Sequence, residues 1–410
     1  MNLIFKNSRI FQRMHEGPLG SYIDSYAAEM REQGYCAAAM ESQIRLVADF
    51  SRWMMKSQII PQKITTQCCK TYLRCRARRL HPKRDDWAAL NRLYSLLLRQ
   101  RIIVEPSPPT ATPANEIQAE FARYLGRERG LVSSTVSCYA SFAGEFLADR
   151  FGVGPIDWSL LCPANVIGFV QRRSASIQSK RVQLLTTALR SFLRWARYRA
   201  DIGSDLEACV PSVANWSLST VPRALPPGQS KRVLAACNRK TAVGRRDYAI
   251  LLLLARLGLR ACEVVRLTLE DLDWQAGLIT VRGKGGRRSQ MPVPLDVGNA
   301  IADYLRNARP LTMNRCVFLR CRAPITSFHG SQAIADVVRH GLARAGIDSP
   351  RKGAHQFRHT LASEMLRQGA SLSEIGELLR HRSPQTTAIY AKVDLVSLRA
   401  LALPWPESAQ

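Results

Sequence analysis

Residues 355–390 of the chain read HQFRHTLASEMLRQGASLSEIGELLRHRSPQTTAIY, and this stretch decides what the C-terminal part of the protein is expected to be. His355 and Arg358 lie three residues apart, so an α-helix here would place both side chains on one face. His381 and Tyr390 follow, nine residues apart, with a Ser-Pro break between them. Taken singly, each has an ordinary structural explanation, because such a histidine or tyrosine can simply be a hydrogen-bonded core residue.

Two further cations lie upstream of this stretch. Arg260 comes just after an apolar run, residues 247–257, that predicts a buried helix. Lys284 lies in a glycine-rich turn between two runs, 277–282 and 289–294, that are typical of the strands of a hairpin. Helical patterns dominate from there to the C-terminus. The fold expected is therefore mainly α, with a small antiparallel β-sheet in the C-terminal domain.

A phosphodiester makes chemical demands that this set of side chains meets together. Arg260 and Arg358 offer two permanently charged, planar groups that match phosphate oxygens. The phenol of Tyr390, with an ordinary pKa of about 10, needs a base before it can act as a nucleophile. Lys284 on a hairpin could protonate the leaving oxygen. The set contains no carboxylate cluster of metal-binding type, which disfavours metal-assisted hydrolysis.

From about residue 228 to 395 the sequence resembles the catalytic domain of the tyrosine recombinase, or phage integrase, family. Any one of its motifs is weak, whereas six such residues in the family's order and approximate spacing are specific. Residues 114–205 resemble the helical core-binding domain of that family through their helix pattern alone. The matching motifs are Gly258-Leu-Arg260-Ala-Cys-Glu263, Gly283-Lys284-Gly285, His355-Gln-Phe-Arg358-His359, Leu379-Arg-His381 and Thr386-Thr-Ala-Ile-Tyr390.

The resemblance implies roles for the cations and the acids near them. Arg260 and Arg358 would clamp the scissile phosphate and stabilise its pentacoordinate transition state. Lys284 would protonate the leaving 5′-hydroxyl. Glu263 and Asp271 match acidic positions that the family uses structurally, so we expect them to orient Arg260 or nearby backbone. Because such a reaction exchanges one bond for another and retains its energy, no cofactor and no metal are expected.

The resemblance also implies roles for the histidines and the tyrosine. His355 would act as acid and base toward Tyr390, and Tyr390 would form a 3′-phosphotyrosine. His381 would hydrogen-bond the phosphate. The family usually has glycine immediately before this second histidine, whereas this chain has Arg380. Arg380 is therefore expected either to change the turn or to add a phosphate contact.

The composition favours a polyanionic partner. The chain has 59 Lys and Arg against 32 Asp and Glu, a formal net charge of +27, and double-stranded DNA is the leading partner for such a surplus. Its 11 cysteines are scattered with no CxxC pair, so reduced thiols are expected rather than a metal site at Cys316, Cys321 and His329. No apolar run approaches the length of a membrane span. The expected location is cytoplasmic and nucleoid-associated, with no membrane contact.

Two proline-rich stretches, 106–113 and 211–227, predict linkers between domains. They divide the chain into an additional N-terminal helical domain, a helical core-binding domain, a linker and a catalytic domain. The four parts are 1–105, 114–205, 206–227 and 228–410.

The sequence pattern of the first of these domains resembles that of the second, which suggests a duplicated helical module. Gly34-Tyr35 leads into a helical pattern as Gly130-Leu131 does, and the pattern of 87–98 resembles that of 184–195. Ser133 or Ser134 is expected to cap the second helix of the core-binding domain. A basic run from Arg74 to Arg84 can be a solvated face or a set of phosphate contacts.

Three functions are compatible with these observations. The first is a recombinase or integrase of a mobile element, acting as a homo-tetramer on two DNA sites, with or without related recombinases. The second is a type IB topoisomerase, which shares the chemistry but needs no synapsis. The third is a DNA-binding protein that kept the fold and lost the reaction, although six intact catalytic side chains argue against it. A short amphipathic helix is expected over 393–401, packing on its own domain or on a neighbouring protomer.

Overall fold

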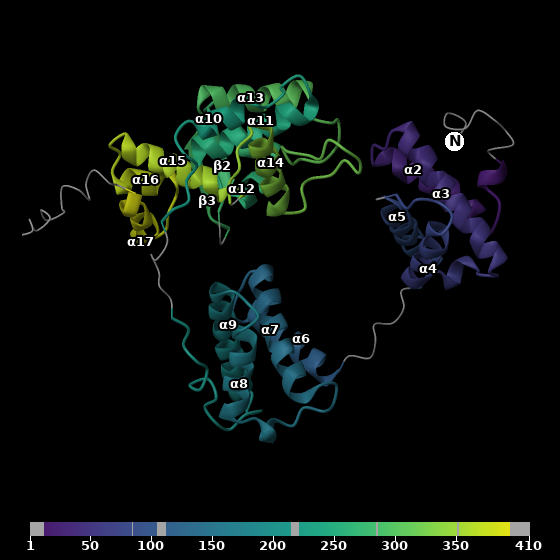
Figure 1. Cartoon of the computed structure of the whole chain (residues 1–410), viewed down its shortest axis with the longest axis horizontal. Coiled ribbons are helices and arrows are strands. Elements are labelled where there is room, and N and C mark those ends of the chain that lie inside the picture. The colour runs from purple at the N-terminus through teal and green to yellow at the C-terminus, as the bar shows by residue number, and fades with distance from the viewer. Residues whose placement is uncertain are drawn as a thin grey trace, which may run out of the picture. The chain divides into compact units, whose positions relative to one another are not determined.

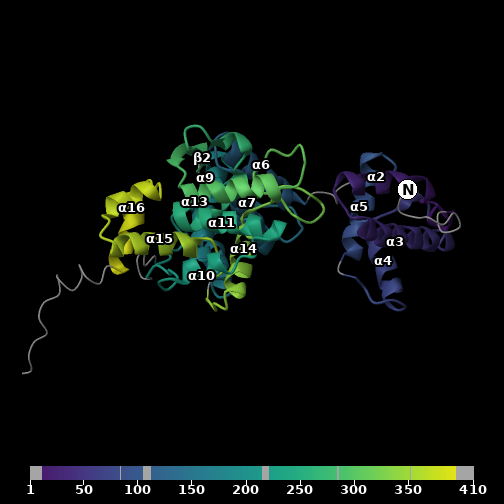
Figure 2. The ribbon, with the colours of Figure 1, turned by 90° about the horizontal axis from the view of Figure 1, so that it is seen from above.

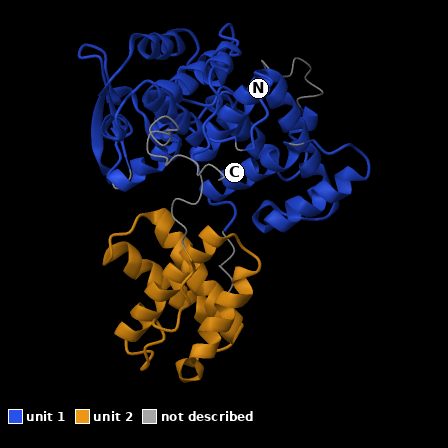
Figure 3. Cartoon of the chain, turned by 60° about the vertical axis from the view of Figure 1, so that its left-hand side comes forward, with its two compact units in different colours: residues 1–105, 220–410 blue, residues 106–219 orange. Residues whose placement is uncertain are grey.

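The computed structural model describes residues 12–83, 85–104, 112–214, 221–283, 286–350 and 352–393. The chain divides into two compact units, residues 1–105 with 220–410 and residues 106–219, coloured separately in Figure 3. The fold is mainly α, with one small antiparallel sheet, as the sequence predicts.

The N-terminal part is a four-helix unit with its own hydrophobic core, formed between Met14 and Ile103. Its second helix is the longest, and the largest side chains of that helix, such as Phe50, face inward. The elements are η1 (Gly20–Tyr22), α2 (Ile23–Glu32), α3 (Ala37–Lys56), η2 (Pro61–Lys63), α4 (Thr66–Ala77) and α5 (Asp86–Arg99), shown in Figure 1.

The middle part is a second four-helix unit, whose core is rich in phenylalanine. The expected cap at Ser133 or Ser134 was wrong. The helix begins at Ser133 itself, and the residue before it, Val132, makes no side-chain cap. The elements are α6 (Pro113–Arg127), α7 (Ser133–Phe151), η3 (Trp158–Leu160), α8 (Pro163–Ser174) and α9 (Ser179–Tyr198).

The C-terminal part is built around α11 (Ala242–Leu257), the helix predicted from its apolar run. Thr241 caps its start by accepting a hydrogen bond from Gly244, and Gly258 ends it with a left-handed φ of 56°. The helix contacts α13, α14 and α15 (Figure 2). The other helices of this part up to residue 367 are α10 (Gln229–Ala235), α12 (Ala261–Arg266), η4 (Leu269–Asp271), α13 (Leu295–Asn307), α14 (Ser331–Arg344) and α15 (His355–Arg367).

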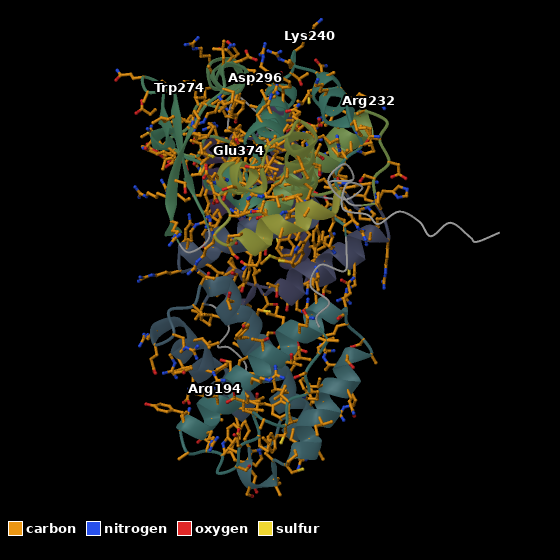
Figure 4. The ribbon with its side chains drawn as sticks, turned by 90° about the vertical axis from the view of Figure 1, so that its left-hand side faces the viewer. Arg194, Arg232, Lys240, Trp274, Asp296 and Glu374 are labelled. Carbon is orange, nitrogen blue, oxygen red and sulfur yellow. The ribbon has the colours of Figure 1, made fainter. Side chains whose placement is uncertain are left out.

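The sheet has three strands in the order β1-β2-β3, all antiparallel. They are β1 (Leu272–Asp273), β2 (Leu278–Arg282) and β3 (Arg288–Pro292), so the predicted hairpin forms. The second strand of the hairpin, β3, was expected to reach Pro294, but Pro294 lacks an amide donor and instead precedes α13. Trp274, labelled in Figure 4, follows β1 and is exposed.

The chain then continues through α16 (Leu372–Leu378), α17 (Pro384–Thr387) and η6 (Ala388–Val393). The helix α15 contacts α11 on one side and both α16 and η6 on the other. The helix α15 therefore lies between the main core and a small second core around Ile375, Leu379 and Tyr390. The helix expected over 393–401 lies outside the described residues, apart from Val393.

Candidate active site

Arg358 connects three segments of the C-terminal part of the chain. It is the fourth residue of α15 and is only 4% exposed. Its Nη1 donates to the carbonyl of Gly258 at 2.5 Å, and its Nη2 donates to the carbonyl of Leu379. Burial lowers the pKa of Arg358 to about 10, and the nearby charges of Arg260 and Arg380 act in the same direction. Arg358 thus holds the loop before Arg260 and the end of α16 on either side of α15.

Glu263 lies between two arginines and is fully buried. The backbone N–H and Nη1 of Arg260 donate to its carboxylate at 2.8 and 2.9 Å. Arg380 Nη2 donates to the same carboxylate at 2.8 Å. Glu263 therefore orients Arg260, the role expected of it. Asp271 instead accepts a hydrogen bond from the backbone of Thr268 at 2.9 Å and so supports nearby backbone.

Arg380 stands where relatives usually have glycine, and its backbone shows why glycine suits that position. Its φ is 53°, in the left-handed region that disfavours a side chain. Its guanidinium is occupied by the carboxylate of Glu263 and also contacts the sulfur of Met291. Burial lowers the pKa of Arg380. The departure from the family pattern is therefore accommodated by a strained turn and a buried ion pair.

Tyr390 lies in η6 and is almost completely buried, at 1% exposure. Its phenol oxygen is 3.0 Å from Nδ1 of His359, on α15. Burial raises the pKa of Tyr390 to about 12, opposed by the charge of Arg358. The pKa of His359 is lowered by burial and by the nearby His355 and Arg358. At neutral pH the site thus pairs a protonated phenol with a neutral imidazole, which can accept the phenol's proton.

His381 lies beside the same tyrosine. Its Nδ1 is 2.7 Å from the hydroxyl oxygen of Thr387, and its ring is stacked parallel to that of Tyr390, with centroids 6.5 Å apart. The pKa of His381 is lowered to about 4, first by burial and then by the charges of Arg358 and Arg260. His381 is therefore neutral and fixed in orientation.

The structure brings five of the six residues singled out from the sequence into one region. His355 begins α15, with its ring centroid 6.4 Å from that of His359. Lys284, which lies between β2 and β3 in the sequence, is outside the described residues. His359 was not predicted from the sequence to have a role, although it follows His355 by four residues and shares its helical face. The five residues are Arg260, His355, Arg358, His381 and Tyr390.

Two absences hold for the part of the chain that the structure describes. No group of three or more His, Cys, Asp or Glu side chains there could hold a metal ion. Within the same residues, no helix is both long and apolar enough to cross a membrane.

Comparisons with known proteins indicate the family of the chain. The sequence model of the phage integrase family matches residues 223–395. The chain is 49% identical over 401 residues to y4rA, an integrase/recombinase of Sinorhizobium fredii, covering 97% of each. It is 27% identical to the tyrosine recombinase XerD of Listeria monocytogenes, covering 70% of this chain and 96% of XerD.

Solved structures show the same fold. One is XerH bound to a palindromic difH substrate, with a TM-score of 0.54 and 16% identity over 69% of this chain and 83% of that one. Another is a lambda integrase dimer on a COC′ core site, with a TM-score of 0.52 and 14% identity over 80% and 91%. The identity to y4rA extends over nearly the whole chain. The chain belongs to the phage integrase family of tyrosine site-specific recombinases.

Proposed function

We propose that this recombinase cleaves and rejoins double-stranded DNA of a mobile element through a 3′-phosphotyrosine at Tyr390. The observation that carries the proposal is the 3.0 Å contact between the Tyr390 phenol and His359, next to Arg358. Its relatives support it, since y4rA is named an integrase/recombinase and XerH is seen with its DNA in a post-cleavage complex.

The reaction would be an exchange of phosphate esters. The Tyr390 oxygen would attack the scissile phosphorus as its proton passes to Nδ1 of His359. The bond from phosphorus to the 5′-oxygen would break, and Lys284 would protonate that oxygen. Rejoining would run the same steps backwards with a 5′-hydroxyl of the partner strand. The family resemblance implied the proton-accepting role for His355, whereas the proposal gives it to His359, and the 3.0 Å contact of its Nδ1 with the phenol supports this choice.

The arginines would stabilise the charge that accumulates on the nonbridging oxygens. Arg260 is about one-third exposed, at 31%, and so can reach a phosphate while Glu263 fixes its orientation. His355 is neutral because burial lowers its pKa, as do the charges of Arg358 and Arg260. It would therefore lie beside the phosphate as a hydrogen-bonding group, with His381 on the other side of the tyrosine.

We further propose which parts of the chain hold the DNA and how many copies assemble on it. Residues 114–205 and 228–410 would hold one duplex between them, and the linker 206–227 would let them do so. Four copies would bring two DNA sites together and exchange strands pairwise. Lambda integrase, seen as a dimer bound to a COC′ core site, supports assembly of this kind on DNA.

A suicide substrate tests the chemistry. A nicked duplex carrying the sequence that flanks the gene should trap a covalent protein–DNA adduct with the wild-type chain and none with Tyr390→Phe. An adduct that persists in Tyr390→Phe would rule out Tyr390 as the nucleophile. Lys284→Ala should slow cleavage, and a 5′-thiol leaving group should restore the rate if Lys284 is the acid.

The topoisomerase alternative has its own outcome. Relaxation of supercoiled plasmid without recombinant products from two-site substrates would favour it. Recombinant products that require both sites would favour the recombinase.

A further inference from the structure

The N-terminal unit repeats the middle unit in detail. Both have four helices in one order, and in both a one-turn 3-10 helix separates the second helix from the third. Gly34 and Gly130, each with positive φ, precede the second helix of their units. The buried pairs of α3 and α7 keep one constant spacing: Ile44 and Ala140, Leu46 and Phe142, Val47 and Ala143, Phe50 and Phe146.

The last helix of each unit repeats even more closely, including its C-terminal turn. Arg101 and Ala200 both have left-handed φ, of 58° and 62°, and Ile103 and Ile202 are both buried just after them. The register differs by two residues from the one expected from the sequence. The buried pairs of α5 and α9 are Ala89 and Ala188, Leu90 and Leu189, Leu93 and Phe192, Tyr94 and Leu193, Leu96 and Trp195, Leu97 and Ala196.

Each of the two copies has an ion pair between its second and third helices, at equivalent positions. Arg76 on α4 lies 3.8 Å from Asp49 on α3, and Arg173 on α8 lies 2.5 Å from Glu145 on α7. Each arginine is the eleventh residue of its helix, and each acid is the thirteenth of its own. The N-terminal unit is therefore a second copy of the core-binding module.

The first copy has a cationic groove between α3 and α4, and several of its cations have no counterpart in the second copy. Two adjoining cavities of about 420 and 410 Å³ share Asp49, Arg52, Arg76 and Leu80 in their walls. The acids that line them, Asp49 and Asp86, both pair with Arg76. The cations that line them are Arg13, Arg45, Arg52, Lys56, Arg76, Arg78, Arg79 and Lys83.

The scaffold does not need these cations, because the second copy folds in the same way without them. At the positions of Arg52, Lys56, Arg78 and Arg79 it has Ala148, Gly152, Ala175 and Ser176.

The charge of the groove is also available to a ligand. Lys56, Arg78 and Arg79 are exposed and take part in none of the ion pairs among the described residues. On the corresponding helices of the second copy, by contrast, Arg172 and Arg173 of α8 are paired with Asp149 and Glu145 of α7. From residue 50 to 84 the chain has no Asp or Glu. Unpaired like charges gathered in a hollow repel one another unless a polyanion neutralises them.

We propose that this groove of the N-terminal unit binds the phosphate backbone of duplex DNA, so that one chain contacts DNA through two copies of the same module. The inference rests on the proposed function only in the choice of duplex DNA as the polyanion. Phosphate contacts position a protein without reading sequence, so the groove would add affinity and extend the contacted length of the site.

Salt dependence of binding by the full-length chain tests the groove. Fluorescence anisotropy with a labelled random-sequence duplex should give a slope of log affinity against log salt whose steepness reports how many phosphates the protein neutralises. Replacing Lys56, Arg78 and Arg79 by Gln should make that slope shallower by about 2.7, since each contact contributes roughly 0.9. All proteins would carry Tyr390→Phe, so the result is independent of whether the adduct forms.

The matched control removes three exposed cations of the same unit that line neither cavity. Arg31, Lys63 and Arg101, replaced by Gln, should leave the slope within about 0.5 of the parent, less than the roughly 0.9 of a single contact. Equal slopes for both triple variants would overturn the proposal. So would a change in the sedimentation of the groove variant without DNA, which would indicate a contact with a second copy of the chain. Far-UV circular dichroism of both variants verifies that they remain folded.

Discussion

Substitution of Arg380 measures what the buried carboxylate of Glu263 contributes to stability, because two opposing effects act at Arg380. Its left-handed φ costs stability, and glycine would remove about 1 kcal/mol of that strain. Its ion pair with Glu263, 13% exposed on one side and 0% on the other, opposes this. Breaking such a pair costs about 3 kcal/mol when one partner keeps some contact with water.

Arg380→Gly should therefore change Tm in opposite directions in the wild-type chain and in the Glu263→Gln variant. In the wild-type chain it should destabilise the catalytic domain by about 2 kcal/mol, a fall in Tm of roughly 4–8 °C for a domain of this size. In Glu263→Gln it should raise Tm by about 2–4 °C, because the strain is relieved and an unpaired buried charge is removed.

Differential scanning calorimetry of the four proteins measures this, using the transition that Glu263→Gln moves. Arg382→Gly, an exposed neighbour, is the control and should shift Tm equally in both backgrounds. An equal fall for Arg380→Gly in both backgrounds would show that the two residues are not coupled. A rise in both would show that backbone strain outweighs the ion pair, and the account of the turn would be wrong.

Three further predictions follow from the site. Because the folded pKa of His381 is lowered to about 4, the stability it contributes should be complete above its unfolded pKa of about 6.5 and be lost as pH falls toward 4; calorimetry of His381→Asn should show a smaller loss over that range. His359→Gln should slow adduct formation by about 10²-fold at neutral pH. Because the pKa of His359 is lowered, the wild-type rate should fall only in acid below the ordinary histidine pKa of about 6.5, and that of the variant should not, whereas a uniform loss at every pH would indicate a structural role. Gly258→Ala should destabilise by about 2 kcal/mol in urea unfolding, since a Cβ there would lie 2.7 Å from Leu379 at a φ of 56°. Gly277→Ala, which shares the positive φ but meets nothing within 4 Å, should cost only the strain.

Features that depend on neighbours along the chain could be predicted from the sequence. The apolar run before Arg260 became α11, and the glycine-rich turn joined two antiparallel strands, because helical periodicity and turn chemistry are local properties. The proximity of His355 and Arg358 could also be predicted, since they needed only one helix to share a face. The repeat of the N-terminal unit was visible, but the register of its last helix was misaligned by two residues, because helical periodicity alone does not determine register.

The sequence by itself determined the family, the reaction class and the nucleophile expected in it, since these depend on which side chains are present and in what order. Only the tertiary structure decided which groups touch. His359 reaches Tyr390 because α15 packs against η6, 31 residues further on. Arg380 pairs with Glu263, 117 residues away, because the end of α16 packs close to α12. Such contacts arise from the packing of helices around a shared core, and burial in that core is what shifts the pKa values of the tyrosine and the histidines.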